Sequence, residues 1–151
     1  MRSDTITVFN FHERTGTWRT TVFSGVSLYK TDSTNATPGN GKVNAATVDA
    51  IIDTCMDGNR TPVYRESSAA TEKKKYIGPK AYAKLESPDG FFTFKPERDF
   101  FVKGDHATDP IADEDYDQGL YHHMNDELDD VHMIVSAIFY SLLPHFEIGG
   151  R

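Results

Sequence analysis

The sequence contains a single cysteine, Cys55, in 151 residues. One thiol cannot build a framework of internal disulfides, and we expect Cys55 to be a buried or half-buried side chain. Long apolar runs are also absent, since the longest one near the C-terminus, residues 133–143, is too short to span a bilayer. The N-terminal residues lack the apolar stretch of a signal peptide. These absences predict a soluble protein that is made in a cytoplasm and has no membrane partner.

Apolar residues are scarce throughout the chain, at 38% of the sequence with a mean hydropathy of -0.53. The length suits one domain with a real core, so this composition predicts long polar loops or burial that partners complete. The net charge of -7 argues against a protein that binds nucleic acid by neutralising its phosphates. It is compatible with a surface that DNA slides past without sticking.

Aromatic residues gather in one stretch, residues 91–105, which reads FFTFKPERDFFVKGD. It predicts two short strands, 91–94 and 99–103, around a polar corner at 95–98, because aromatic side chains favour a half-buried pleated surface. Pro96 cannot donate to a strand ladder and fits the corner. We take these strands as the centre of a mainly β fold, a small β-barrel or sandwich with a short helix and long polar loops.

The N-terminal part of the chain predicts a β-hairpin. Residues 5–12 and 17–23 alternate polar and apolar side chains with a period of two, and Gly16 supplies the turn between them. Gly25 indicates a bulge, after which the second strand continues through residues 26–29.

Further elements follow from local composition. Residues 43–56 fit both a helix face and a strand face, and their β-branched residues and the needs of a barrel favour a strand. Pro79 suits the first position of a short helix over 80–86. Strands are expected at 131–139 and 145–148.

Three polar segments are predicted as extended loops of a single domain that spans residues 1–151. They lie at about 31–42, 57–75 and 106–130. The last of them includes DEDYDQGLYHHMNDELDD, which has eight acidic residues and no Lys or Arg, so we expect it to stay out of the core. Because these segments hold few apolar residues, they are expected to become ordered against neighbouring molecules.

A group of histidines and acids near residue 130 is the one enzyme-like feature. His122, His123 and His132 are weak candidates for metal ligands, but their spacing is not that of a known site. The acidic residues Asp113, Asp115 and Asp117 do not complete a calcium loop, because its glycine and its final glutamate are both missing from the required positions. No catalytic residue, cofactor or physiological metal is predicted, and we expect the protein not to be an enzyme.

Contact with a partner or a channel is the remaining role for charged side chains. The short basic run Lys73, Lys74 and Lys75 reads as a solvated loop, or as a contact with an acidic partner surface or DNA. Together with the three aspartates above, these lysines are the candidate contact residues.

Three pieces of the sequence, in this order, resemble one family of proteins. They are TITVFNFHERTGTWRTTVFSGVSLY, then YIGPKAYAKL followed by FFTFKPERDFFVKGD, and finally DDVHMIVSAIFYSLLPHFEIGGR, which together make about half of the chain. The pattern is similar to small proteins encoded in the head–tail gene cluster of long-tailed bacteriophages. In size and layout it is similar to head-closure (stopper) and head–tail joining proteins. The segments at 57–75 and 109–132 depart from the usual pattern.

The resemblance implies a structural virion protein of the phage neck. Copies of it would form a homo-oligomeric ring between the portal or adaptor protein of the head and the tail terminator or tail-tube proteins. The ring would surround a channel through which double-stranded DNA passes without sequence-specific binding, and residues 113–130 or 31–42 would line it. Open strand edges would be capped by a strand from a neighbouring subunit.

Three alternatives stay open at the level of sequence. A tail terminator or tail-completion protein would occupy the same junction, and would be favoured if residues 43–56 and 131–142 were helical. A metal-binding module or metal-dependent enzyme would use the three histidines named above. A host-derived binding module would be expected to stay monomeric in solution.

Overall fold

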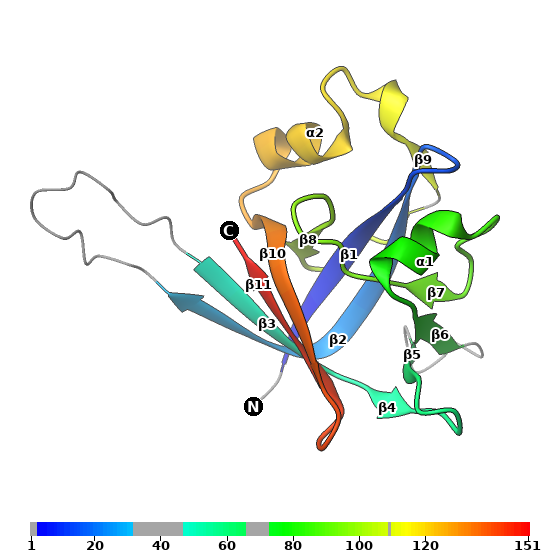
Figure 1. Cartoon of the computed structure of the whole chain (residues 1–151). Coiled ribbons are helices and arrows are strands. Elements are labelled where there is room, and N and C mark those ends of the chain that lie inside the picture. The colour runs from blue at the N-terminus through cyan, green and yellow to red at the C-terminus, as the bar shows by residue number, and fades with distance from the viewer. Residues whose placement is uncertain (1–2, 32–46, 66–72, 109) are drawn as a thin grey trace, which may run out of the picture.

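The structure is a computed structural model that describes residues 3–31, 47–65, 73–108 and 110–151 (Figure 1). In chain order its elements are β1 (Asp4–His12), β2 (Thr17–Thr31), β3 (Thr47–Asp53), β4 (Cys55–Met56), β5 (Pro62–Arg65), β6 (Lys73–Tyr76), α1 (Pro79–Lys84), β7 (Phe91–Phe92), β8 (Phe100–Lys103), β9 (Ile111–Ala112), the 3-10 helix η1 (Asp113–Asp115), α2 (Leu120–Glu127), β10 (Val131–Tyr140) and β11 (His145–Gly150).

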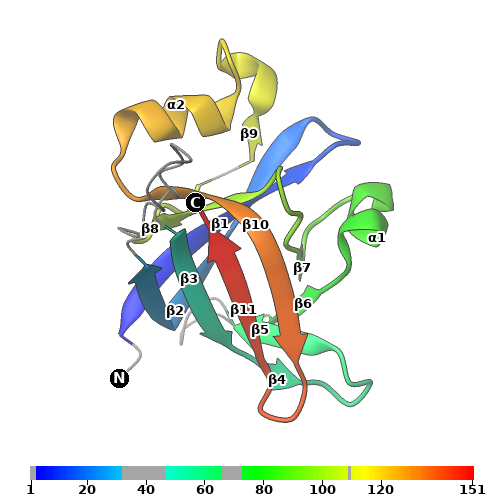
Figure 2. The ribbon, with the colours of Figure 1, turned by 60° about the vertical axis from the view of Figure 1, so that its left-hand side comes forward.

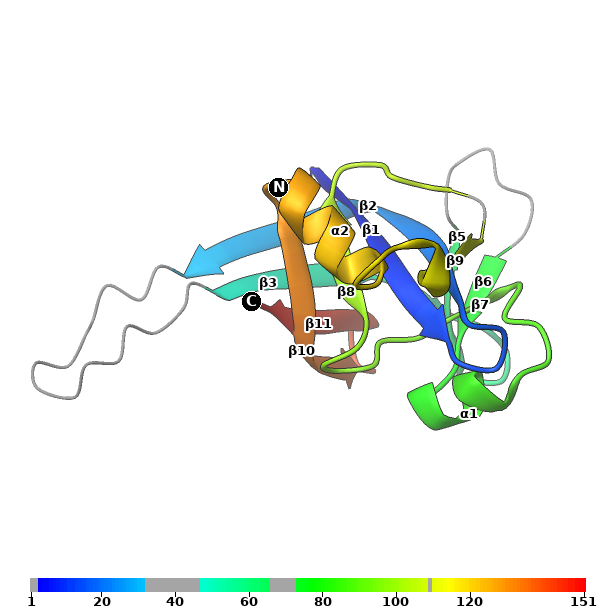
Figure 3. The ribbon, with the colours of Figure 1, turned by 90° about the horizontal axis from the view of Figure 1, so that it is seen from above.

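Six strands close into a barrel in the order β1-β8-β10-β11-β3-β2, because β2 pairs back onto β1. β9 adds a short extension on β2, and β4, β5, β6 and β7 form a second, smaller sheet. Figure 3 shows this smaller sheet and α1 on the same side of the molecule. The predicted mainly β fold, a small barrel with a short helix, is therefore confirmed.

The N-terminal hairpin forms as its alternation predicts. β1 and β2 pair antiparallel from Thr5 opposite Ser24 to His12 opposite Thr17. Gly16 has a φ of +68°, as the turn requires. The register shifts next to Gly25, whose φ is +66°, so the predicted bulge is confirmed and β2 continues beyond it.

The aromatic stretch lies where the barrel meets the smaller sheet. β7 ends at Phe92, earlier than predicted, and belongs to the smaller sheet, whereas β8 pairs with β1 and β10 in the barrel. The polar corner between them is fastened by Asp99, which is buried and accepts hydrogen bonds from three nitrogens. These are the backbone nitrogens of Phe11 (3.0 Å) and Lys95 (2.9 Å) and the side-chain amide of Asn10 (2.9 Å).

Two buried clusters hold the fold together. The larger fills the barrel and continues onto the smaller sheet through Phe92 and Phe94, against which Tyr64 and Tyr76 pack. The second lies on the other face of β1 and β8, where α2 covers them (Figures 1 and 3). β1 and β8 are thus buried on both faces, which fits the apolar sequence of β8 and the buried polar residues Thr7, Asn10 and His12 of β1.

The prediction of a loop at 57–75 is wrong for two parts of that segment, which form the strands β5 and β6. Composition concealed β6 because its residues are three lysines and a tyrosine. The strand is stabilised by pairing with β5 and β7 and by the packing of Tyr76 against the core. The predicted loop at 31–42 lies outside the described residues, apart from its first residue, which ends β2.

The prediction of a loop at 106–130 is also wrong, since this segment contains β9, η1 and α2. α2 does contribute to a core, because Leu120 is buried against the barrel and Tyr121 and Met124 are partly buried beside it. An acidic helix needs only one such apolar face to dock. Cys55 is exposed on β4 and not buried as expected, because β4 lies at the edge of the smaller sheet.

The other predicted elements are present. The strand favoured for 43–56 forms as β3 from Thr47, and β10 and β11 follow the predicted strands. Helix α1 begins at Pro79 as expected. It is tied to the barrel by His12, whose Nε2 donates to the carbonyl oxygen of Leu85 at 2.8 Å.

Candidate functional site

The hairpin of β10 and β11 presents the most exposed large apolar side chains among the described residues. Leu142 is 94% exposed and Leu143 is 77% exposed, and both lie in the turn that joins the two strands. Ile138 and Tyr140, further up β10, are 52% and 43% exposed. Figure 2 shows this hairpin extending beyond the neighbouring strand β3. Grouped apolar side chains of this kind are typical of a contact surface.

The turn that carries the two leucines is held in place by several contacts. The ring of His145 stacks on Tyr140 at 4.9 Å, and its Nδ1 donates to the carbonyl oxygen of Leu143 at 2.6 Å. The backbone nitrogen of Thr54 donates to the carbonyl oxygen of Pro144 at 3.0 Å. The exposed leucines are therefore presented by a braced turn, which lowers the entropy cost of binding them.

The three candidate aspartates near α2 have different roles. Asp113 accepts hydrogen bonds from Trp18 Nε1 (2.8 Å) and from the backbone nitrogen of Leu120 (2.9 Å). Burial opposes its ionisation, but these hydrogen bonds and the charge of Arg98 outweigh burial and lower the pKa of Asp113. Asp115 and Asp117 are exposed. Asp113 thus fastens α2 to the barrel, and the other two remain available to a partner.

The basic run forms strand β6 and points in two directions. Lys73 and Lys75 are exposed, and Lys75 lies 3.8 Å from Asp57. Lys74 faces the barrel, where its ammonium group donates to the backbone oxygen of Thr20 (2.7 Å) and to the hydroxyl of Thr21 (3.1 Å). Two of the three lysines are therefore open to a partner, while Lys74 connects the smaller sheet to the barrel.

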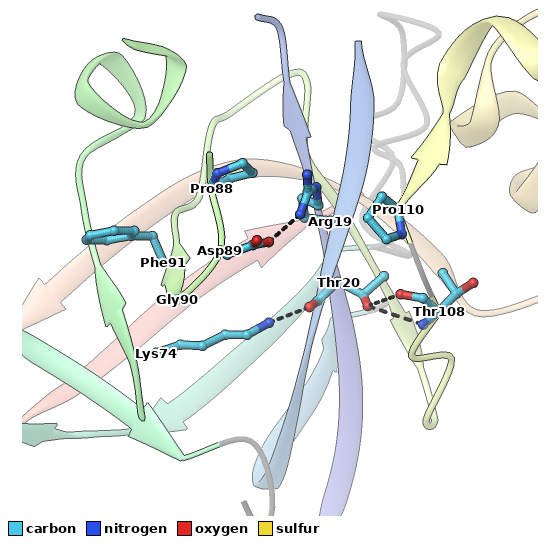
Figure 4. A pocket seen from close by; sticks show the side chains of 9 residues that line it. All are labelled: Arg19, Thr20, Lys74, Pro88, Asp89, Gly90, Phe91, Thr108 and Pro110. Carbon is cyan, nitrogen blue, oxygen red and sulfur yellow. Dashed lines mark hydrogen bonds and ion pairs between the residues drawn. The ribbon is translucent and has the colours of Figure 1, made fainter. Parts of the chain in front are cut away.

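A shallow groove of about 190 Å³ lies at this connection (Figure 4). Figure 4 shows Lys74 reaching across it to Thr20, and Arg19 pairing with Asp89 from the turn before β7. The hydroxyl of Thr20 also bonds to the backbone of Thr108. These polar groups bond to one another and connect the smaller sheet to the barrel.

The three candidate histidines do not come together. His122 pairs with Asp126 one turn along α2 (3.2 Å), and His123 packs against Tyr116 (4.6 Å between ring centres). His132 lies on β10 against Phe101, and burial lowers its pKa despite the attraction of Asp130. No group of three or more His, Cys, Asp or Glu side chains is placed to hold a metal ion within the described ranges.

A protein-family model, described as a family of unknown function (DUF6751), matches residues 1–151. The chain belongs to the DUF6751 family. No curated protein and no solved structure matches it. None of the helices described in this DUF6751 chain has the length and apolar character needed to cross a membrane.

The sequence did not indicate the most exposed apolar side chains among the residues that the structure describes in this DUF6751 chain. Leu142 and Leu143 lie just beyond the strand predicted at 131–139, and the apolar run to which they belong gives no sign of which residues face solvent. The one available signal was their position next to Pro144, since a turn carries its side chains outward. No sequence pattern predicted the ion pair between Arg19 and Asp89, because the two residues are distant in sequence.

Proposed function

We propose that this protein is a structural component of the neck of a long-tailed bacteriophage. Copies of it form a ring that joins the portal or adaptor of the head to the tail, and DNA passes through the ring. The proposal rests on the resemblance of three sequence pieces to head–tail connector proteins. The closed barrel with attached elements supports it, since those proteins are small β-barrels.

The hairpin tip is the observation that most favours an assembly role. Leu142 and Leu143 stand in solvent on a braced turn, and exposed leucines are costly to leave without a partner. A subunit that works between two larger structures needs surfaces of this kind. The geometry supports binding better than catalysis, because the polar groups at the groove and around Asp113 are engaged in holding elements together.

Charge is consistent with a DNA channel. The net charge is -7, and the exposed acids Asp115 and Asp117 lie beside α2. A lumen with the same sign of charge as DNA lowers adhesion and lets the duplex slide. The exposed lysines of β6, Lys73 and Lys75, are suited to an acidic protein partner.

The head-closure position is favoured over that of a tail terminator. Helices at residues 43–56 and 131–142 would favour the terminator. The described parts of these segments are mainly the strands β3 and β10.

A gene deletion in the phage that encodes the protein tests the proposal. Particles grown without it are expected to yield separate heads and tails, and supplying the protein in trans is expected to restore tailed particles. Mass spectrometry of purified virions should detect the protein, and a reconstruction should place it at the neck. Tailed, infectious particles that form without the protein would contradict the proposal.

A further inference from the structure

We infer that the leucine tip of one copy inserts into an apolar hollow beside α1 of the next copy. The inference rests on the proposed ring and names the contact that would build it. The tip consists of Leu142 and Leu143 in the turn between β10 and β11, and the occupant of the hollow is a second copy of this chain.

The hollow has the shape and chemistry that a leucine side chain requires. It has a volume of about 330 Å³, and its walls are Pro79, Ala83 and the side chains of Lys80, Lys84 and Lys95. The hydrocarbon stems of lysines add to the apolar surface while their ammonium groups stay in water. Because an apolar cavity of about 150 Å³ accommodates benzene, this hollow has room for an aliphatic side chain.

The charges around the two surfaces are opposite. Three lysines surround the hollow, and one of them, Lys95, already lies 3.1 Å from Glu13. On the hairpin side, Glu147 on β11, which lies 3.2 Å from Nε2 of His145, and Asp53 on the neighbouring strand β3 are near the tip. Lysines opposite carboxylates would steer two copies together and fix their orientation.

The positions of the two surfaces favour a repeating contact. Figures 1 and 2 show the hairpin turn at one end of the barrel and α1 on the side that carries the smaller sheet. Unless two copies exchange tips around a two-fold axis, a contact between two different surfaces of identical copies leaves one tip and one hollow unused at the ends. Such a contact adds further copies until the assembly closes into a ring or continues as a filament.

Disulfide trapping between copies tests the inference. Cys55 is exposed and is first changed to serine, so that it cannot react. In that background, Leu142→Cys with Ala83→Cys is oxidised at high protein concentration and separated on a non-reducing gel. The expected result is a ladder of covalent dimers, trimers and larger species. Mixing the two single-cysteine variants should give a linked dimer and no ladder.

Two further variants complete the test. Leu143→Asp added to the double-cysteine protein should reduce the ladder by about tenfold or more, because a buried leucine is worth that much in association. Tyr29→Ser, which removes an exposed aromatic residue from β2, should leave the ladder unchanged. Circular dichroism of each variant confirms that it is folded.

The outcomes separate this inference from the proposed function. A double variant that gives no more product than the single variants overturns the contact, and dimers in Leu142→Cys alone would indicate that two tips meet each other. Either result leaves the neck assignment standing if the protein is found in virions. A ladder from a protein that is absent from virions would support the contact and contradict the neck function.

Discussion

The indole nitrogen of Trp18 donates a hydrogen bond to the carboxylate of Asp113 at 2.8 Å. The same carboxylate oxygen accepts the backbone nitrogen of Leu120, the first residue of α2. One acidic side chain therefore connects β2 of the barrel to the helix that covers it. Trp18 is the only tryptophan in the chain, so its fluorescence reports directly on this contact.

Replacing Asp113 with alanine is expected to loosen α2. The variant leaves two donors without their acceptor, which should lower the free energy of unfolding by about 1–3 kcal/mol. Asp113→Asn keeps an acceptor oxygen and should lose clearly less. Urea denaturation followed by Trp18 fluorescence measures both. Equal losses in the two variants would show that the charge of Asp113, and not its hydrogen bonding, stabilises the contact.

Asp99 is expected to make the stability of the protein depend on pH. Burial raises the pKa of Asp99 to about 6, although three nitrogens donate to it. Between its unfolded value near 3.8 and about 6, the folded chain holds a proton that the unfolded chain releases. The contribution of this group to stability is therefore largest below the unfolded pKa and falls as pH rises through 6, by about 3 kcal/mol at most.

Comparison with Asp99→Asn isolates that effect from the other titrating groups. The wild-type chain should gain stability relative to this variant as pH is lowered from 7.5 to 4.5, as measured by urea denaturation. A carbon-13 NMR titration of the Asp99 carboxyl group checks the pKa in the wild-type protein. A relative loss of stability on acidification would mean that the hydrogen bonds to the carboxylate outweigh its burial.

Tyr82→Phe is expected to raise the stability of the protein. The ring of Tyr82 is buried against His12, and its hydroxyl has no hydrogen-bond partner in the part of the chain that the structure describes. Removing an unsatisfied buried hydroxyl should increase the free energy of unfolding by about 1 kcal/mol. Thermal unfolding by calorimetry measures the change. A decrease of similar size in the free energy of unfolding would indicate that a bound water hydrogen-bonds to this hydroxyl.

Gly150→Ala is expected to destabilise the barrel. A Cβ atom at this position would lie 2.8 Å from the ring of Phe101 and 3.0 Å from Cβ of His132. Relieving these contacts must move a buried strand, which should cost about 1–3 kcal/mol. Gly58→Ala is the matched control, since nothing lies within 4 Å of its added carbon. If both variants melt at the same temperature, the packing around Gly150 is looser than these distances indicate.

Sequence patterns predicted those elements whose side chains alternate or cluster. The hairpin of β1 and β2 and the final strands β10 and β11 follow from alternation and β-branched residues, and α1 follows from Pro79. These elements can be predicted from short stretches of sequence, because the type of each residue depends on whether its side chain faces the core or the solvent.

Elements stabilised by distant contacts escaped prediction. β6 is a strand because its backbone pairs with β5 and β7 and because Lys74 reaches the oxygen of Thr20. α2 docks through Leu120 and the bond between Trp18 and Asp113, whose members are 95 positions apart. Composition within a short window contains no information about partners at that separation, so both segments resembled solvated loops.

Closure of the barrel changes one expectation about how copies meet. Because β1 bonds to both β8 and β2, the barrel is closed, and the free backbone edges of its described strands are confined to short segments such as residues 135–140 of β10, which pair only with β11. The outer strands β4 and β7 of the smaller sheet have two residues each. Strand pairing between copies would therefore have only short templates, which limits strand exchange and amyloid-type growth.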